Sequence, residues 1–140
     1  MEHNFVVHPS IDYNWDSPLV PGTVVCAKYE DFDGKPRVGI FCVLYDEQLD
    51  SNTEHCKNTI CCKISTQTTL VSTYSARIDI NYNSFLNSPC IACCSKIHVL
   101  HKQNNIYKIL GRLSSGTMKL IMKNYTKFSN ELNRQLLDVI

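Results

Sequence analysis

The chain has 140 residues and a formal net charge of +1 at pH 7; 44% of its residues are hydrophobic and 19% are charged. This length favours one domain with a single core, and the composition excludes an intrinsically disordered chain. No apolar run approaches the roughly 18–20 residues that a membrane-spanning helix needs. The start lacks the basic and apolar regions of a secretory signal, so we expect a cytoplasmic protein without a membrane partner.

The charges divide unevenly along the chain. Residues 1–55 hold ten acidic and three basic side chains, a balance of −7, whereas residues 56–140 hold three acidic and eleven basic ones, a balance of +8. A surface built mainly from the second half would suit a polyanion. Folding can interleave the two halves, so charge alone leaves a nucleic-acid partner undecided.

Eight cysteines raise the question of disulfides or zinc. Without an export signal we predict reduced thiols, and most of them lie in apolar runs where cysteine acts as a small hydrophobe. Zinc remains an alternative, because zinc's ligand types occur together along the chain. The residues concerned are Cys90, Cys93, Cys94, His98 and His101, with Cys56 or Cys61 to complete a set. We expect neither a metal nor another cofactor.

The chain begins with an acidic segment, residues 1–20, which prolines interrupt and which we predict to be an irregular extension. A single domain then covers residues 21–140. The alternating, β-branched run at 21–29 predicts a strand. An Asp33-Gly34 turn joins it to a second strand at 37–45, which is apolar enough to be buried on both faces.

The middle of the chain continues in short strands. We predict a third strand at 59–66, a loop and edge strand within 67–81, and a turn at 87–89. The segments 90–102 and 105–113 are predicted to pair with each other as a second hairpin.

The tail has a different period. Apolar residues recur there at steps of three and four, which predicts one face of a long helix, with Ser114 or Ser115 as its cap. These residues are Met118, Ile121, Tyr125, Phe128, Leu132, Leu136 and Val139. The elements together predict a mainly β fold with a C-terminal helix (α+β), built as a strongly bent sheet or small barrel.

The order of these elements resembles the PemK/MazF family of toxin endoribonucleases over roughly residues 21–140. The opening strand "PGTVVCAKY" and the arginine-led "DGKPRVGIFCVL" correspond to the first two strands of the family. "CCKISTQ" is similar to its third-strand end, and "SPCIACCSKIHVL", "KILGRLSSGTM" and the final helix follow in the family's order. One departure is that the family has Pro after the arginine, whereas here Pro36 precedes it.

The resemblance implies an SH3-like barrel that forms a homodimer and cleaves single-stranded RNA without a metal. It also implies an antitoxin partner. In the family, the active-site pair is the strand-leading arginine and the hydroxyl after the third-strand isoleucine. These positions fall on Arg37 and Ser65, with Thr66 as the neighbouring candidate.

Arg37 has the chemistry that metal-free RNA cleavage requires. When the ribose 2′-OH attacks phosphorus, negative charge gathers on the phosphoryl oxygens, and a planar guanidinium matches two of them. The alternative is a surface ion pair with Asp31 or Asp33 across the turn, and for Ser65 it is a hydroxyl satisfied by backbone. The general base stays open among four residues: His98, His101, Glu30 and Asp31.

Binding of RNA needs further cations and aromatic rings. Six residues are candidates for a basic rim around Arg37: Lys28, Lys35, Lys63, Arg77, Lys96 and His98. Phe32 and Tyr29 are candidates for stacking on unpaired bases. The alternatives are a core position for Tyr29 and ordinary solvated charge for each lysine.

A second function on the same barrel is a non-catalytic interaction protein, for example one encoded by a phage or mobile element that blocks a host enzyme or defence complex. Three features motivate it: the altered Arg37-Val38 junction, the undecided base and the acidic extension. Negative charge on such an extension can mimic nucleic acid.

Overall fold

A computed structural model describes residues 17–31, 33–49, 57–69 and 71–139 of the chain. Its described strands form one antiparallel sheet of six in the order β4-β5-β3-β2-β1-β6. The strands are β1 (Thr23–Glu30), β2 (Pro36–Asp46), β3 (Asn58–Ser65), β4 (Ser75–Ile78), β5 (Cys90–His101) and β6 (Ile106–Arg112). The helices are η2 (Glu47–Leu49), α1 (Lys102–Asn105) and α2 (Ser115–Val139). The predicted mainly β fold with a C-terminal helix is therefore confirmed.

The first hairpin forms as the sequence predicts. β1 and β2 pair from Val24↔Cys42 to Glu30↔Pro36. Gly34 has φ +77°, a left-handed conformation that glycine adopts without steric cost. Inside the turn, the Gly34 N–H donates to the Asp31 carbonyl at 2.8 Å.

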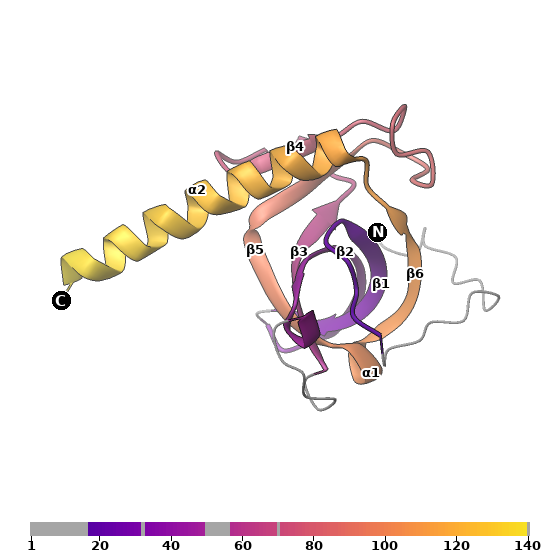
Figure 1. The fold of residues 1–140 in the computed structure, drawn as a ribbon, viewed down its shortest axis with the longest axis horizontal. Coiled ribbons are helices and arrows are strands. Elements are labelled where there is room, and N and C mark those ends of the chain that lie inside the picture. The colour runs from indigo at the N-terminus through magenta and orange to yellow at the C-terminus, as the bar shows by residue number, and fades with distance from the viewer. Residues whose placement is uncertain (1–16, 32, 50–56, 70, 140) are drawn as a thin grey trace.

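The predicted second hairpin is wrong. β5 pairs with β3 and β4, whereas β6 pairs with β1 at the other end of the sheet. The residues between them, Lys102–Asn105, form the short helix α1 instead of a tight turn. Figure 1 shows the sheet curling so that β5 and β6 stand on opposite sides, with α1 connecting them. The curvature of the sheet, which no local pattern encodes, decides this pairing.

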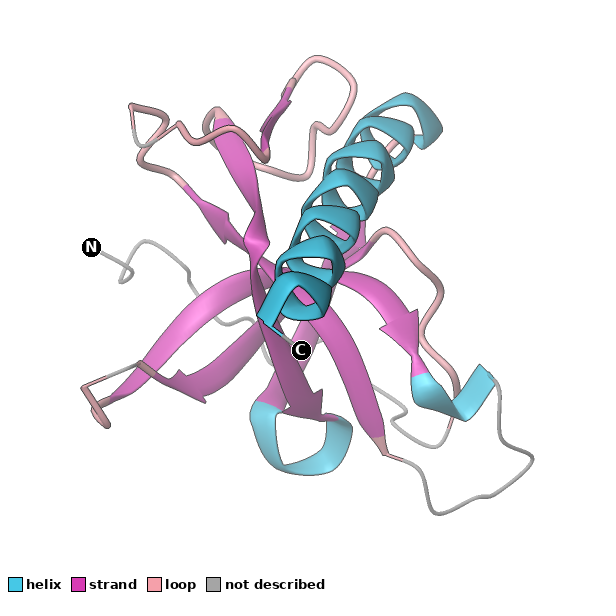
Figure 2. Cartoon of the chain, turned by 90° about the vertical axis from the view of Figure 1, so that its left-hand side faces the viewer, coloured by secondary structure: helices cyan, strands magenta, loops and turns pink. Residues whose placement is uncertain are grey.

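Two apolar clusters lie on the two faces of the sheet. The larger one contains Ile40, Cys42, Ile64 and Ala92, and α2 covers it through Ile121, which is fully buried. Figure 2 shows α2 crossing the sheet on this side. The smaller cluster on the opposite face consists of Leu19, Val25, Ala27, Tyr29, Phe41, Val43, Cys61, Leu100 and Ile106.

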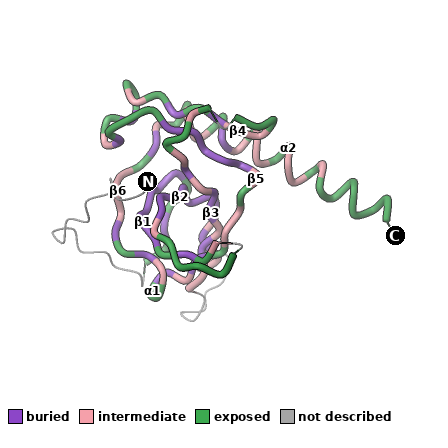
Figure 3. The backbone as a smooth tube through the Cα atoms, turned by 180° about the vertical axis from the view of Figure 1, so that it is seen from behind, coloured by how far each residue is buried: buried purple, intermediate pink, exposed green. Residues whose placement is uncertain are grey.

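Helix α2 packs on the sheet only along its first half. Ser114 precedes it as predicted, with its Oγ accepting from the Thr117 N–H at 3.3 Å. The last ring contact is Phe128 on Tyr74, with centroids 5.4 Å apart. Beyond this point the predicted apolar face continues, but Leu132, Leu136 and Val139 are 44%, 55% and 84% exposed. This distal half extends away from the sheet (Figures 1 and 3).

Neither α2 nor any other helix in the described part of the chain has the length and apolarity needed to cross a membrane.

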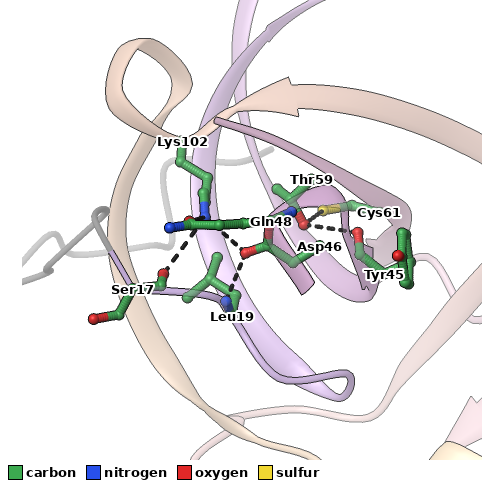
Figure 4. A network of polar contacts seen from close by, with 8 residues as sticks. All are labelled: Ser17, Leu19, Tyr45, Asp46, Gln48, Thr59, Cys61 and Lys102. Carbon is green, nitrogen blue, oxygen red and sulfur yellow. Dashed lines mark hydrogen bonds and ion pairs between the residues drawn. The ribbon is translucent and has the colours of Figure 1, made fainter. Parts of the chain in front are cut away.

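A buried ion pair joins three distant parts of the chain (Figure 4). Lys102 Nζ lies 2.8 Å from Asp46 Oδ2, and both side chains are fully buried. The same carboxylate accepts from the backbone N–H of Leu19 at 2.6 Å and, through Oδ1, from that of Gln48 at 2.9 Å. Lys102 also donates to the Gln48 side chain. The end of β2, the β5–β6 connection and the start of the described chain are thus held at one point.

The division of the chain at residue 20, into an extension and a domain, remains a prediction, since residues 1–16 lie outside the described residues.

Removing one partner of this pair should destabilise the fold strongly. Asp46→Ala leaves a buried ammonium without its counter-charge, and we expect it to lower the free energy of unfolding by about 3–5 kcal/mol. Urea denaturation followed by circular dichroism measures this. Lys127→Ala, at an exposed position of α2 that precedes its distal half, is the control and should change stability by less than about 0.5 kcal/mol. A cost below about 1 kcal/mol for Asp46→Ala would contradict the role assigned to the pair.

Candidate functional site

The register of the first three strands places several polar side chains on one face. Tyr29 pairs directly with Arg37 across β1 and β2, and Phe41 pairs with Lys63 across β2 and β3. Residues directly opposite each other in a sheet share a face, and so do residues two apart on a strand. Arg37, Tyr29 and Lys63 therefore lie on the face of the smaller apolar cluster, opposite α2. We call the set Tyr29, Arg37, Lys63 and His98 the cationic face.

Three rings form the base of this face. Tyr29, Phe41 and His98 contact one another edge to face, with centroids 5.1–5.3 Å apart. Tyr29 is only 5% exposed, so it packs in the core and is not available to stack on a base. Its hydroxyl accepts from Lys63 Nζ at 2.6 Å, and that ammonium stands 4.8 Å from the ring centroid. Lys63 is thereby fixed over the rings.

Arg37 is held by the carboxylates of its own hairpin. Its Nε lies 2.9 Å from Asp31 Oδ2, and its Nη2 lies 3.4 Å from Asp33 Oδ2. The side chain is 41% exposed, so solvent or a ligand reaches it from one side. The ion pairs considered as an alternative to phosphate binding are thus present, in a geometry that keeps the guanidinium on the cationic face.

His98 has its imidazole in the neutral form at pH 7. Burial lowers its pKa below the usual value, and the charges of Lys63 and Lys96 lower it further, while Asp31 opposes the shift. His98 and Lys63 both contact the Tyr29 ring, which places the imidazole beside the ammonium. A neutral imidazole next to two cations has the properties of a general base.

A bulge in β5 brings His98 to this position. Cys62 pairs with Ile97, but the next residue of β3, Lys63, pairs with Cys93. Residues 94–96 are thus inserted opposite a single step of β3. Bulges bend a strand and redirect its side chains, and they are common next to active sites.

Ser65 and Thr66 occupy the end of β3. Ser65 lies two residues beyond Lys63 and shares its face, and its Oγ accepts from the Gln67 N–H at 3.1 Å. Extending the β2–β3 register by one residue puts Ser65 opposite Gly39, and Arg37 is two residues farther along β2. Such diagonal neighbours stand about 7–8 Å apart. Thr66 is exposed and follows the last residue of β3.

Gly39 lets the Tyr29 and Phe41 rings pack closely against β2. A β-carbon at this position would stand 3.1 Å from Tyr29 Cε1 and 3.6 Å from Phe41 Cε1. Most real contacts of a β-carbon are longer than the first of these distances, so any larger residue would displace the Tyr29 ring that supports Lys63.

The other predicted RNA-binding residues are spread more widely. Lys96 is exposed next to His98, and Arg77 shares the face of Ser65, because both pair with Ile91. Lys28 is exposed on the opposite face of β1, and Lys35 lies in the turn, where its N–H donates to Asp33. Phe32 lies outside the described residues.

Two of the four candidate bases lie away from the cationic face. His101 caps α1, with its Nδ1 accepting from the Asn104 N–H at 3.2 Å. Glu30 is exposed and, by alternation along β1, points away from the face of Tyr29. Asp31 is engaged by Arg37. His98 is therefore the candidate base that the geometry favours.

The described cysteines are buried and unbridged. Burial raises the pKa of the Cys61 thiol to about 12, which keeps it protonated and unreactive. Within the described ranges, no three His, Cys, Asp or Glu side chains are grouped to hold a metal ion. The zinc alternative thus finds no site among the described residues, while Cys56 lies outside them.

The sequence does not reveal how three residues support this face. Its patterns leave Tyr29 either as a stacking ring or as a core residue, make Lys63 one of several rim lysines, and give Gly39 no role. The alternation of β1, β2 and β3 places all three on one face once the register is known. The sequence pattern that could have indicated this is the alternation along β2, which puts residues 37, 39 and 41 on the same face of the strand.

Solved structures show the same fold. An endoribonuclease in complex with its cognate antitoxin from a mycobacterial species matches with a TM-score of 0.61 and 12% identity, over 80% of this chain and 95% of that one. The Mycobacterium tuberculosis toxin MazF-mt6 matches with a TM-score of 0.58 and 14% identity, over 77% and 96% of the two chains. A MazE–MazF structure from Deinococcus radiodurans matches with a TM-score of 0.59 and 8% identity, over 81% and 98%.

The chain therefore has the fold of the MazF-type endoribonuclease toxins, as the sequence resemblance predicted. No protein-family model matches the sequence, and neither does any curated protein sequence. The similarity is one of backbone fold, so the role of each side chain depends on the geometry of this chain itself.

The ionisation of His98 gives a direct test of the cationic face. Its folded-state pKa is lowered, so the unfolded chain binds more protons near and below pH 6.5, and stability conferred by the neutral ring is lost as pH falls through that range. We expect an NMR titration midpoint for His98 below about 6.5, rising in Lys63→Met because a neighbouring positive charge is removed. Lys127→Met, on an exposed part of α2, is the control. A midpoint at or above the ordinary value in the native protein would refute this electrostatic description.

Proposed function

We propose that this protein is a metal-independent endoribonuclease of the toxin type that cleaves single-stranded RNA. The observation that carries the proposal is the cationic face, where Arg37, Lys63 and a neutral His98 gather around a hairpin end. The fold it shares with endoribonuclease toxins supports the proposal independently.

In this proposal the scissile phosphate rests between Arg37 and Lys63. His98 takes the proton of the ribose 2′-OH, and the freed oxygen attacks phosphorus. The two cations stabilise the charge that builds on the phosphoryl oxygens, which is the largest single contribution in reactions of this kind. The bond to the leaving 5′-oxygen breaks as that oxygen takes a proton from the Lys63 ammonium. The products are a 2′,3′-cyclic phosphate and a 5′-hydroxyl, and exchange with water resets both side chains.

Ser65 completes the site as a hydrogen-bond donor to a phosphoryl oxygen. Its hydroxyl hydrogen is free to turn toward a ligand while Oγ accepts from Gln67. Thr66, Lys96 and Arg77 are proposed to contact neighbouring nucleotides. Lys28 and Lys35 have less support, because one lies on the opposite face and the other in the turn.

An antitoxin protein is the proposed partner and the cytoplasm the proposed location. The structural neighbours include an endoribonuclease with its cognate antitoxin and MazE–MazF complexes. The cationic face would be covered by such a partner if the partner offers carboxylates to Arg37 and Lys63.

Cleavage of single-stranded RNA of mixed sequence, in buffer with EDTA, tests the proposed activity. We expect Arg37→Ala and Lys63→Ala each to lower the single-turnover rate by about 10²–10³-fold, since each removes a charge that stabilises the transition state. Lys127→Ala removes an exposed lysine on α2 and should leave the rate unchanged.

Intact RNA after incubation with folded native protein would overturn the proposed activity. The non-catalytic interaction protein would then be the better description, and a pull-down with the native chain and with Arg37→Ala would test it.

We also propose that the protein is a homodimer in which the distal halves of α2, residues 129–139, pack against each other. Leu132, Leu136 and Val139 continue the stripe that packs on the sheet, yet the chain itself leaves them exposed. This segment carries both signs of charge, through Glu131, Arg134 and Asp138, so two antiparallel copies do not repel each other. Two-fold pairing covers the same patch on both copies.

Light scattering after size-exclusion chromatography tests this contact. We expect a species of twice the 16.0 kDa chain mass, and the Leu132→Ser/Leu136→Ser variant should be monomeric with unchanged secondary structure. Leu120→Ser, which changes an exposed leucine on the opposite side of α2, is the control and should remain dimeric. A native protein that runs as a monomer, or a dimeric double variant, would exclude this interface.

A further inference from the structure

The two carboxylates that hold Arg37 are not equivalent. Asp31 contacts Nε at 2.9 Å, whereas Asp33 contacts Nη2 at 3.4 Å, which is at the outer limit for a hydrogen bond. Asp31 directly follows the last residue of β1, and its backbone N–H donates to the Lys35 carbonyl at 3.1 Å. Asp33 lies within the turn, where its Oδ1 accepts from the Lys35 N–H. Asp31 is therefore held by the backbone at the end of the sheet, whereas Asp33 is held only within the exposed turn.

The atoms that they occupy also differ in function. A guanidinium binds phosphate through two parallel N–H groups, which gives this contact its geometric precision. A carboxylate on Nε fixes the plane of the group and leaves the Nη edge available for phosphate. A carboxylate on Nη2 occupies part of that edge and presents the same charge and oxygen geometry as a phosphate.

We propose that Asp31 is a positioning residue for Arg37, and that Asp33 is an internal competitor which RNA phosphate displaces. The inference rests on the proposed function, and it assigns opposite effects to two neighbouring aspartates.

Two isosteric variants separate these roles. Asp33→Asn keeps an oxygen for the Lys35 N–H and removes the competing charge. We expect it to tighten binding of a mixed-sequence 2′-O-methyl RNA, which lacks the attacking hydroxyl, by roughly two- to fivefold, the value of an exposed ion pair. Its single-turnover rate at saturating RNA should match that of the native protein.

Asp31→Asn should act in the opposite sense. Binding of the 2′-O-methyl RNA should stay within about twofold of native, because the phosphate contact through Nη remains. The single-turnover rate at saturating RNA should fall roughly ten- to a hundredfold, since Asn offers Nε only a neutral hydrogen bond, which holds the guanidinium less firmly in the orientation that the transition state requires. Glu30→Gln removes the adjacent negative charge on the other face of β1 and serves as the control for general electrostatics.

The same three variants in an Arg37→Gln background complete the experiment. There we expect neither aspartate to matter for binding or rate. The inference is overturned if Asp31→Asn and Asp33→Asn have the same effects on RNA binding and on the cleavage rate. It is also overturned if Glu30→Gln has the same effect as either aspartate variant, or if the effects of the aspartate variants persist in the Arg37→Gln background. An inactive native protein would instead reject the proposed function itself, which keeps the two failures apart.

Discussion

The buried pair of Lys102 and Asp46 is the constraint on which the rest of the structure depends. It connects the end of β2 to α1, and so fastens the chain at the point where it leaves β5 and crosses to the far edge of the sheet. Leu19 donates its N–H to Asp46, and Leu100 and Ile106 flank the connection that carries Lys102. All three belong to the apolar cluster under the cationic face. A buried ion pair contributes little net stability over an apolar substitute, but breaking it is costly, which makes it a device for specifying one arrangement.

The cationic face follows from that arrangement. Tyr29 and Phe41 give it an apolar base, Lys63 is fixed by the Tyr29 hydroxyl, and the β5 bulge brings His98 against both rings. Partial burial strengthens the interactions among these charges, and the pKa of His98 responds to it. Arg37 remains at the rim, half in solvent and oriented by carboxylates of its own hairpin. The cationic face therefore combines a fixed cation, Lys63, a partly exposed one, Arg37, and a neutral base, His98.

Local signals in the sequence were sufficient for the elements but not for their pairing. The Asp33-Gly34 turn, the doubly buried second strand and the capped helix after Ser114 all form as their patterns indicate. The pairing of β6 with β1 instead of β5 depends on how far the sheet curls, and period-2 alternation contains no information on that. The same limit applies to the site. Arg37 was recognisable from its place after the turn, whereas Lys63 and His98 become neighbours only through the register of β3 and a three-residue bulge.

The measurement that tests the central claim most directly is an NMR titration of the protein with mixed-sequence 2′-O-methyl RNA. If the scissile phosphate rests on the cationic face, the largest shifts will fall on the Arg37 guanidinium, the Lys63 ammonium and the His98 ring, and resonances of α2 will stay in place. Shifts confined to α2 or to the opposite face of β1, or none at RNA concentrations that saturate comparable single-strand binders, would contradict it.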